Sequence, residues 1–115
     1  MKLSDIVQKL GPEVRAGAGA LEAEVRGGYA SDLLSDVIAH GREGDLWVTL
    51  QTHQNTVAVA SMKGLAGIVL VNGREPEAET LRKAQAEKIV LLVSALPAFE
   101  VVGRLYALGL SGMRT

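Results

Sequence analysis

Two wholly apolar segments constrain the fold of this chain most. Residues 66–71 and 89–93 contain no polar side chain and show no alternation of polar and apolar positions. Such runs are typical of strands that are covered on both faces, as in a parallel sheet. Between them, a charged stretch begins at Glu75-Pro76 and continues through Lys88, which predicts a helix with proline at its first position and a broad solvated face. The order strand, helix, strand predicts a parallel crossover, with 66–71 as a central strand.

The same alternation extends upstream. Residues 45–50 are predicted to form a strand, and a helix of small residues follows over 56–63. Asn55 is the expected cap of this helix and Gly64 its end. An earlier helix is expected to start from the cap oxygens of Ser31-Asp32. It closes at Gly41, and its predicted buried stripe is Leu33, Leu34, Val37 and Ile38.

Both ends of the chain also show local patterns. A helix is predicted from Leu3 to the Gly11-Pro12 stop, followed by a brief strand at 13–15. Residues 21–25 alternate and end at Gly27-Gly28-Tyr29, which predicts an edge strand with one wet face. Pro97 opens a last helix, with four large apolar residues on one side. These residues are Phe99, Val102, Leu105 and Tyr106.

These elements together predict an α/β fold. The architecture is a three-layer sandwich with a mainly parallel central sheet and helices on both faces. The 115 residues are enough for one domain of ordinary size. We therefore expect a single domain over residues 1–110 and a loose C-terminal tail over 111–115.

Composition excludes several classes of function. Lys+Arg 12 against Asp+Glu 13 leaves a net charge of -1, so nothing favours nucleic acid or an anionic membrane as a partner. Because the chain has Cys 0 and His 2, we expect no disulfide, no metal site and no cofactor. No secretory signal or apolar run of about 18 residues is present. The expected location is the cytoplasm.

The candidate ligand site lies in the polar segments that follow the strands. In an open α/β sheet, ligands bind outside the carboxyl ends of the strands. His53 is the possible acid or base there, Asp32 the carboxylate and Arg74 the group that would meet an anion. The candidate ligand-binding residues are Ser31, Asp32, Gln51, Thr52, His53, Asn55, Asn72, Gly73 and Arg74.

Simpler roles compete with ligand binding at several of these positions. Ser31, Asp32 and Asn55 stand where helix caps are required. Gly73 suits a turn with positive φ, and His40 suits a cation at a helix C-terminus. The role of Trp47 is left open: it would mark an interface if exposed and the core if buried. The chain has no GxxxxGK[ST], GxGxxG, GxSxG or HExxH motif, so no residue is assigned as catalytic.

Segment 44–76 resembles the DRTGG domain family. The most specific part is a strand followed by Asn72-Gly73-Arg74-Glu75-Pro76 and then a helix. Before that strand come a polar loop and the small-residue helix. The resemblance covers nearly the whole chain, from the first helix to about Gly109. It implies an α/β domain similar to the N-terminal domain of HPr kinase/phosphorylase, with regulatory ligand binding and dimerisation rather than catalysis. Such domains occur beside CBS modules in pyrophosphatases, ahead of phosphotransacetylase domains and as stand-alone chains.

The chain departs from the residues that name this family. The family's Asp-Arg falls on Thr52-His53, and its Thr-Gly-Gly falls on Val71-Asn72-Gly73. A neutral imidazole does not replace a permanently charged guanidinium, so an anion contact at that position is in doubt. The similarity to HPr kinase does not imply kinase activity, because this chain has no phosphate-binding loop.

Three functions follow as expectations. The first is a non-enzymatic regulatory or scaffolding domain, homodimeric, with a small anionic or nucleotide-like ligand at the carboxyl ends of the strands. The second is an adaptor in a larger assembly, whose partner would be a redox or metabolic enzyme. The reason is that stand-alone family members are similar to proteins encoded among iron–sulfur hydrogenase and electron-transfer components. The third is a small enzyme with His53 as acid or base and Asp32 to orient it.

Overall fold

A single mixed sheet organises the molecule. The computed structural model describes residues 1–113, and in that range the sheet has five strands in the order β1-β5-β4-β3-β2. β1 runs antiparallel to β5, and all other neighbours are parallel. The strands are β1 (Glu13–Ala16), β2 (Gly27–Ala30), β3 (Asp45–Thr49), β4 (Gly67–Leu70) and β5 (Leu91–Val93). The predicted α/β sandwich is confirmed, with β4 in the centre.

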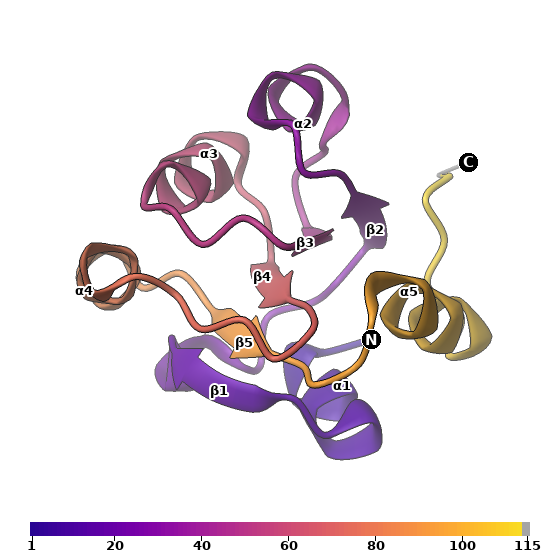
Figure 1. Ribbon diagram of the computed structural model, residues 1–115. Coiled ribbons are helices and arrows are strands. Elements are labelled where there is room, and N and C mark those ends of the chain that lie inside the picture. Colours follow the sequence, from indigo (N-terminus) through magenta and orange to yellow (C-terminus); the bar gives the residue numbers. More distant parts are fainter. Residues whose placement is uncertain (114–115) are drawn as a thin grey trace.

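The helices cover the two faces unequally, as Figure 1 shows. From β2 to β5 each crossover moves one strand further in the same direction. Because crossovers share one hand, their helices fall on the same face of the sheet. The other face is left to the first and last helices, so the sheet is the middle of three layers. The helices are α1 (Leu3–Leu10), α2 (Leu34–His40), α3 (Asn55–Lys63), α4 (Ala78–Glu87) and α5 (Ala98–Ala107).

Each face of the sheet buries its own apolar core. Leu46 and Val48 of β3 pack in the core that α1 and α5 cover. Trp47, between them in the strand, points to the opposite core and is 0% exposed. Its indole Nε1 donates a 2.8 Å hydrogen bond to the carbonyl of Ser31. Trp47 is therefore a core residue and does not mark an interface.

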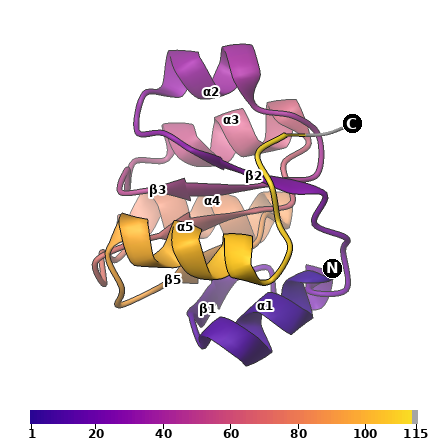
Figure 2. The ribbon, with the colours of Figure 1, turned by 90° about the vertical axis from the view of Figure 1, so that its right-hand side faces the viewer.

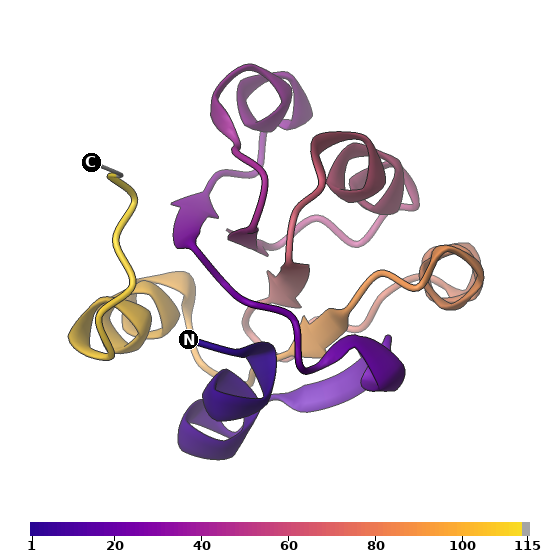
Figure 3. The same ribbon diagram turned by 180° about the vertical axis from the view of Figure 1, so that it is seen from behind.

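The segment before β2 is not the strand that its alternation predicts. Residues 21–26 cross the end of the sheet from β1 to β2 (Figure 3), after a 3-10 turn at Ala18–Ala20. β1 and β2 are at opposite edges, four strand spacings of about 4.8 Å apart. The segment is not extended throughout, because Leu21 has a helical backbone conformation and the N–H of Ala23 binds the Ala20 carbonyl in a turn. The carbonyls of Leu21 and Ala23 bind the N–H groups of Ser4 and Leu3 instead of a neighbouring strand.

Three helix starts also differ from prediction. α2 begins at Leu34 with Leu33 as its N-cap residue, so Ser31 and Asp32 do not cap it. Asn55 is the first residue of α3 rather than its cap. α4 begins at Ala78 rather than at Glu75-Pro76, because the N–H of Glu77 binds the Thr52 carbonyl and keeps Glu77 extended. At Asp32 and Glu77 a tertiary hydrogen bond takes the group that the local pattern assigns to the helix. At α3 the competing contact is local, since His53 Nδ1 accepts from the N–H of Asn55.

The predicted apolar stripes of α2 and α5 are only partly buried. Val37 is buried in α2, whereas Leu33 and Ile38 are exposed. In α5 the core-facing residues are Val101 and Leu105, so the other three residues of the predicted stripe point outward. Their exposed fractions are Phe99 89%, Val102 38% and Tyr106 69%. α5 thus has one apolar face against the sheet and a second against solvent.

The chain after α5 returns along the edge strand. Ser111, where the loose tail was expected, accepts a 3.2 Å hydrogen bond from the N–H of Gly28 in β2. Figure 2 shows this segment passing beside β2. Residues 114–115 of the expected tail lie outside the described residues. Within residues 1–113, no helix is long and apolar enough to cross a membrane.

Candidate functional site

The predicted ligand site is a row of loops at the carboxyl edge of the sheet. The loops follow β2, β3, β4 and β5, and each is hydrogen-bonded to the next. The Asp32 side chain binds the N–H of Leu50, the Thr52 carbonyl binds the N–H of Glu77, and Asn72 donates its N–H to the Leu96 carbonyl at 2.9 Å. The structure therefore brings the predicted residues to one edge, and the loops that carry them support one another.

Asp32 and Gln51 connect the first two loops. Asp32 Oδ1 accepts hydrogen bonds of 2.9 Å from the Thr49 hydroxyl and from the Leu50 N–H. Gln51 Nε2 donates to the Asp32 carbonyl at 3.0 Å. Ser31, one residue earlier, accepts from the N–H of Leu33 through its hydroxyl. These side chains hold the loops in position, and the Asp32 carboxylate is already partly satisfied by them.

His53 performs the capping role that was expected of Asn55. Its Nδ1 accepts a 3.1 Å hydrogen bond from the N–H of Asn55, the first residue of α3. The His53 carbonyl also accepts from the N–H and the hydroxyl of Thr56. In the neutral ring with Nδ1 as acceptor, the proton resides on Nε2. Nδ1 then has no hydrogen to donate to Asp32, so the acid–base pair that the enzyme hypothesis needs is not formed in this arrangement.

Thr52 and Asn55, the candidate residues on either side of His53, are placed differently. The Thr52 carbonyl accepts from the Thr80 hydroxyl at 2.6 Å, so its backbone anchors α4. Asn55 is exposed at the start of α3. The Asn55 side chain is therefore more accessible to solvent than that of Thr52.

The turn after β4 presents Arg74. Asn72 and Gly73 both have left-handed backbone conformations, with φ 59 and φ 65, which confirms the positive φ expected at Gly73. The N–H groups of Gly73 and Arg74 bind the carbonyls of Ser94 and Val71. An anion at this turn would therefore be met by side chains rather than by free backbone N–H groups. Arg74 is exposed and is the cation best placed for that contact.

An ion cluster borders this turn on the β1 side. Arg15 Nε and Nη2 bind the two carboxylate oxygens of Glu75 at 2.7 and 2.8 Å, and Nη2 also pairs with Glu13. The hydrogen bond from Arg15 lowers the pKa of Glu75, and both carboxylates raise the pKa of Arg15. The cluster lines a cavity of about 230 Å³ that Gly73 also borders. One cation beside two carboxylates leaves this cavity negative, so an anion is disfavoured there.

A second cluster, of Tyr29, Asp36 and His40, links β2 to α2. The Tyr29 hydroxyl donates to Asp36 Oδ2 at 2.7 Å, and His40 Nδ1 lies 3.1 Å from Asp36 Oδ1. Hydrogen bonds from Tyr29, Ser31 and His40 lower the pKa of Asp36, and the bond to Asp36 raises the pKa of Tyr29. His40 lies in the last turn of α2, as expected of a helix C-terminal cation.

Sequence reasoning missed both clusters, for different reasons. Arg15 and Glu75 are 60 positions apart, and no local pattern connects them. Asp36 and His40 have the i,i+4 spacing of a helical ion pair, so that signal was available. Tyr29 joins them only because β2 lies beside α2 in space.

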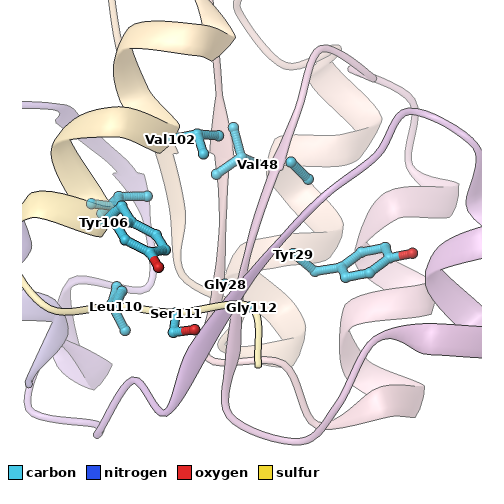
Figure 4. A pocket seen from close by; sticks show the side chains of 10 residues that line it. Gly28, Tyr29, Val48, Val102, Tyr106, Leu110, Ser111 and Gly112 are labelled. Carbon is cyan, nitrogen blue, oxygen red and sulfur yellow. The ribbon is translucent and has the colours of Figure 1, made fainter. Parts of the chain in front are cut away.

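An apolar pocket lies between β2, α5 and the returning C-terminal segment (Figure 4). Its volume is about 130 Å³. Gly28 and Ala30 form a shallow floor because neither has a large side chain, and Val102 and Tyr106 of α5 form a wall. The Tyr29 ring points away from Tyr106, toward the other face of the sheet. None of the nine predicted ligand-binding residues lines this pocket.

The described residues include no group of three or more His, Cys, Asp or Glu side chains that could hold a metal ion. Within the same residues, every buried side-chain nitrogen and oxygen has a hydrogen-bond partner. The carboxyl edge is therefore a satisfied polar surface on which the exposed groups, above all Arg74, remain available for binding.

Comparison with known proteins supports the fold. No family model and no curated protein matches the sequence. A solved structure is similar with a TM-score of 0.71 at 15% sequence identity, over 96% of this chain. It contains the CBS and DRTGG domains of the regulatory region of Clostridium perfringens pyrophosphatase, complexed with the activator diadenosine tetraphosphate. The match spans 48% of that chain. The fold is thus similar to one found in a CBS and DRTGG region.

Proposed function

We propose that this chain is a non-enzymatic regulatory or scaffolding domain that forms a homodimer and binds a small anionic or nucleotide-like ligand at the carboxyl edge of the sheet. The observation that carries the proposal is the row of loops tied to one another at that edge, with Arg74 exposed beside it. A site held in place before the ligand arrives loses little conformational entropy on binding.

The roles of the edge residues follow from their placement. Arg74 meets the anionic group, because a guanidinium binds carboxylate and phosphate oxygens with two hydrogen bonds. Asn55 and Asn72 are exposed, and their amides can donate to one ligand atom and accept from another. His53 offers Nε2 as a further donor while Nδ1 caps α3.

Two further observations support a regulatory rather than a catalytic role. Asp32 and His53 direct their hydrogen-bonding atoms at Leu50 and Asn55 rather than at each other. The similar solved structure is a regulatory region bound to a dinucleotide activator. A nucleotide with several phosphates is accordingly the first ligand class to test.

The test is isothermal titration calorimetry with AMP, ADP, ATP, diadenosine tetraphosphate and inorganic phosphate. We expect at least one to bind, and Arg74→Ala to weaken that binding by about tenfold or more, since a charge-assisted hydrogen bond is lost. Arg82→Ala is the matched control, because Arg82 is an exposed arginine within α4. If none of these compounds binds, or if both variants weaken binding equally, the proposed site is wrong.

A further inference from the structure

The outward face of α5 is an unusual surface for a helix on the outside of a small protein. Phe99, Val102, Gly103 and Tyr106 have the spacing i, i+3, i+4, i+7, which places them on one stripe. The stripe is distinct from the buried one of Val101 and Leu105. Phe99 is 89% exposed and Tyr106 69%. We call these four residues the outer stripe of α5.

We propose that the outer stripe of α5 is the surface through which two copies of this chain associate, with their α5 helices antiparallel about a twofold axis. The inference rests on the homodimer of the proposed function and names the surface that forms it. A twofold interface must be complementary to itself, because the same patch supplies both sides.

The spacing of the outer stripe meets that requirement. The intervals between its four residues are three, one and three positions, and they are the same in either direction along the helix. In an antiparallel pair, Phe99 therefore lies opposite Tyr106 of the second copy, and Val102 lies opposite Gly103 of the second copy. A side-chain carbon at Gly103 would have no atom of its own chain within 4 Å, so this glycine leaves an open gap that the valine can enter. Aromatic residues face each other, and a branched side chain meets a gap.

The charges beside the stripe are complementary in the same arrangement. Glu100 and Arg104 lie on one flank of α5, one turn apart, with Nε and Oε2 separated by 3.6 Å and both side chains more than half exposed. The twofold axis brings equal flanks together. Glu100 then approaches Arg104 of the second copy, and the pair occurs twice. A parallel twofold arrangement would instead place the two charged flanks on opposite sides of the contact, where they could not pair, so the charges favour the antiparallel one.

The surface around the stripe can supply the remaining contact area. A specific interface takes about 800 Å² from each partner, which is more than one short helix offers. The apolar pocket of about 130 Å³ shares Val102 and Tyr106 with the outer stripe and extends it to β2 and the C-terminal segment. Phe99 of the second copy, placed over Tyr106, would cover the rim of this pocket.

Sedimentation velocity of the full chain over a wide range of concentration tests the proposal. We expect a dimer whose dissociation constant rises by about tenfold or more in Phe99→Ser and in Tyr106→Ser. Met62→Ser is the control, since Met62 is a similarly exposed apolar residue (62%) on α3, in the opposite layer. Gly103→Gln is a second variant that fills the gap. It should weaken the dimer without disturbing the fold, because its side chain starts in open space.

A charge reversal tests the antiparallel orientation. Glu100→Arg and Arg104→Glu should each weaken the dimer, and the double variant should restore it. If the wild type is dimeric and the outer-stripe variants dissociate no more readily than Met62→Ser, the α5 surface is wrong while the homodimer stands. If the wild type is a monomer at every concentration, both the surface and the homodimer are wrong, whereas the calorimetric test of ligand binding is unaffected.

Discussion

The hydroxyl of Thr49, the last residue of β3, donates a 2.9 Å hydrogen bond to Asp32 Oδ1 in the loop after β2. Thr49 is 2% exposed, and its oxygen also accepts from the N–H of Gln51. One buried hydroxyl thus joins two loops of the candidate site.

Thr49→Val should lower the free energy of unfolding by about 1–3 kcal/mol, because valine keeps the shape and removes both hydrogen bonds. Urea denaturation followed by the fluorescence of Trp47 measures the loss. In a double-mutant cycle, Asp32→Ala should cost less in the Thr49→Val background than in the wild type. Additive effects of the two substitutions would show that the pair is not coupled.

His53→Ala should destabilise the protein by about 1 kcal/mol, the usual cost of losing a capping acceptor. His53→Asn should recover most of that stability, since an asparagine oxygen can accept from the N–H two residues later. Thermal unfolding of the two variants beside the wild type measures the effect. Equal stability of all three would mean that the contact between His53 and Asn55 contributes nothing.

Two glycines with left-handed backbones should respond differently to alanine. Gly17 has φ 79, and an added Cβ would lie 2.7 Å from the Cα of Val90. Gly73 has φ 65, and its Cβ would meet no atom within 4 Å. Gly73→Ala should therefore cost only the conformational strain, about 1–2 kcal/mol, and Gly17→Ala clearly more. Chemical denaturation of the two variants compares them, and equal losses would contradict the close contact at Gly17.

Acid should weaken the contact between Arg15 and Glu75. The pKa of Glu75 is lowered in the folded protein by the Arg15 hydrogen bond, whereas the ordinary pKa of Glu in an unfolded chain is about 4.3. A lowered folded-state pKa stabilises the protein above the unfolded value, and this stabilisation is lost as pH falls through the folded value.

Between about pH 5 and pH 3, the free energy of unfolding should therefore fall less steeply with decreasing pH in Glu75→Gln than in the wild type. Arg15→Leu should show the same reduced slope. Denaturation at a series of pH values measures the curves. A wild-type curve that runs parallel to that of Glu75→Gln over this range would exclude the contribution.

Local sequence pattern was sufficient for the main elements. The apolar runs around Ile68 and Leu92 are buried strands because both faces of each run carry apolar side chains. The glycines after α1 and α3 end those helices through left-handed caps. The order of strands and helices then determined the parallel sheet, since crossovers share one hand. These inferences needed only near neighbours in the chain.

The candidate site was predictable in its location but not in its contacts. Parallel strands bring their following loops to one edge, so the nine candidate residues lie along that edge. Which atom each of them binds was not predictable, because the partners belong to other elements. The Asp32 carboxylate accepts from the Thr49 hydroxyl, and the Thr52 carbonyl accepts from the Thr80 hydroxyl. The sequence assigned Asp32 to a helix cap and gave no partner for Thr52.

The sequence by itself determined the α/β architecture, the central position of β4 and the edge where ligands are expected. Only the tertiary structure decided that 21–26 crosses the sheet rather than forming a strand, that Arg15 meets Glu75, and that Phe99 and Tyr106 face solvent. Periodicity reports that a helix has an apolar face but not how much of that face the sheet is wide enough to cover. The distinction arises because propensity and patterning act over a few residues, whereas burial and ion pairing depend on which distant segments the fold brings together.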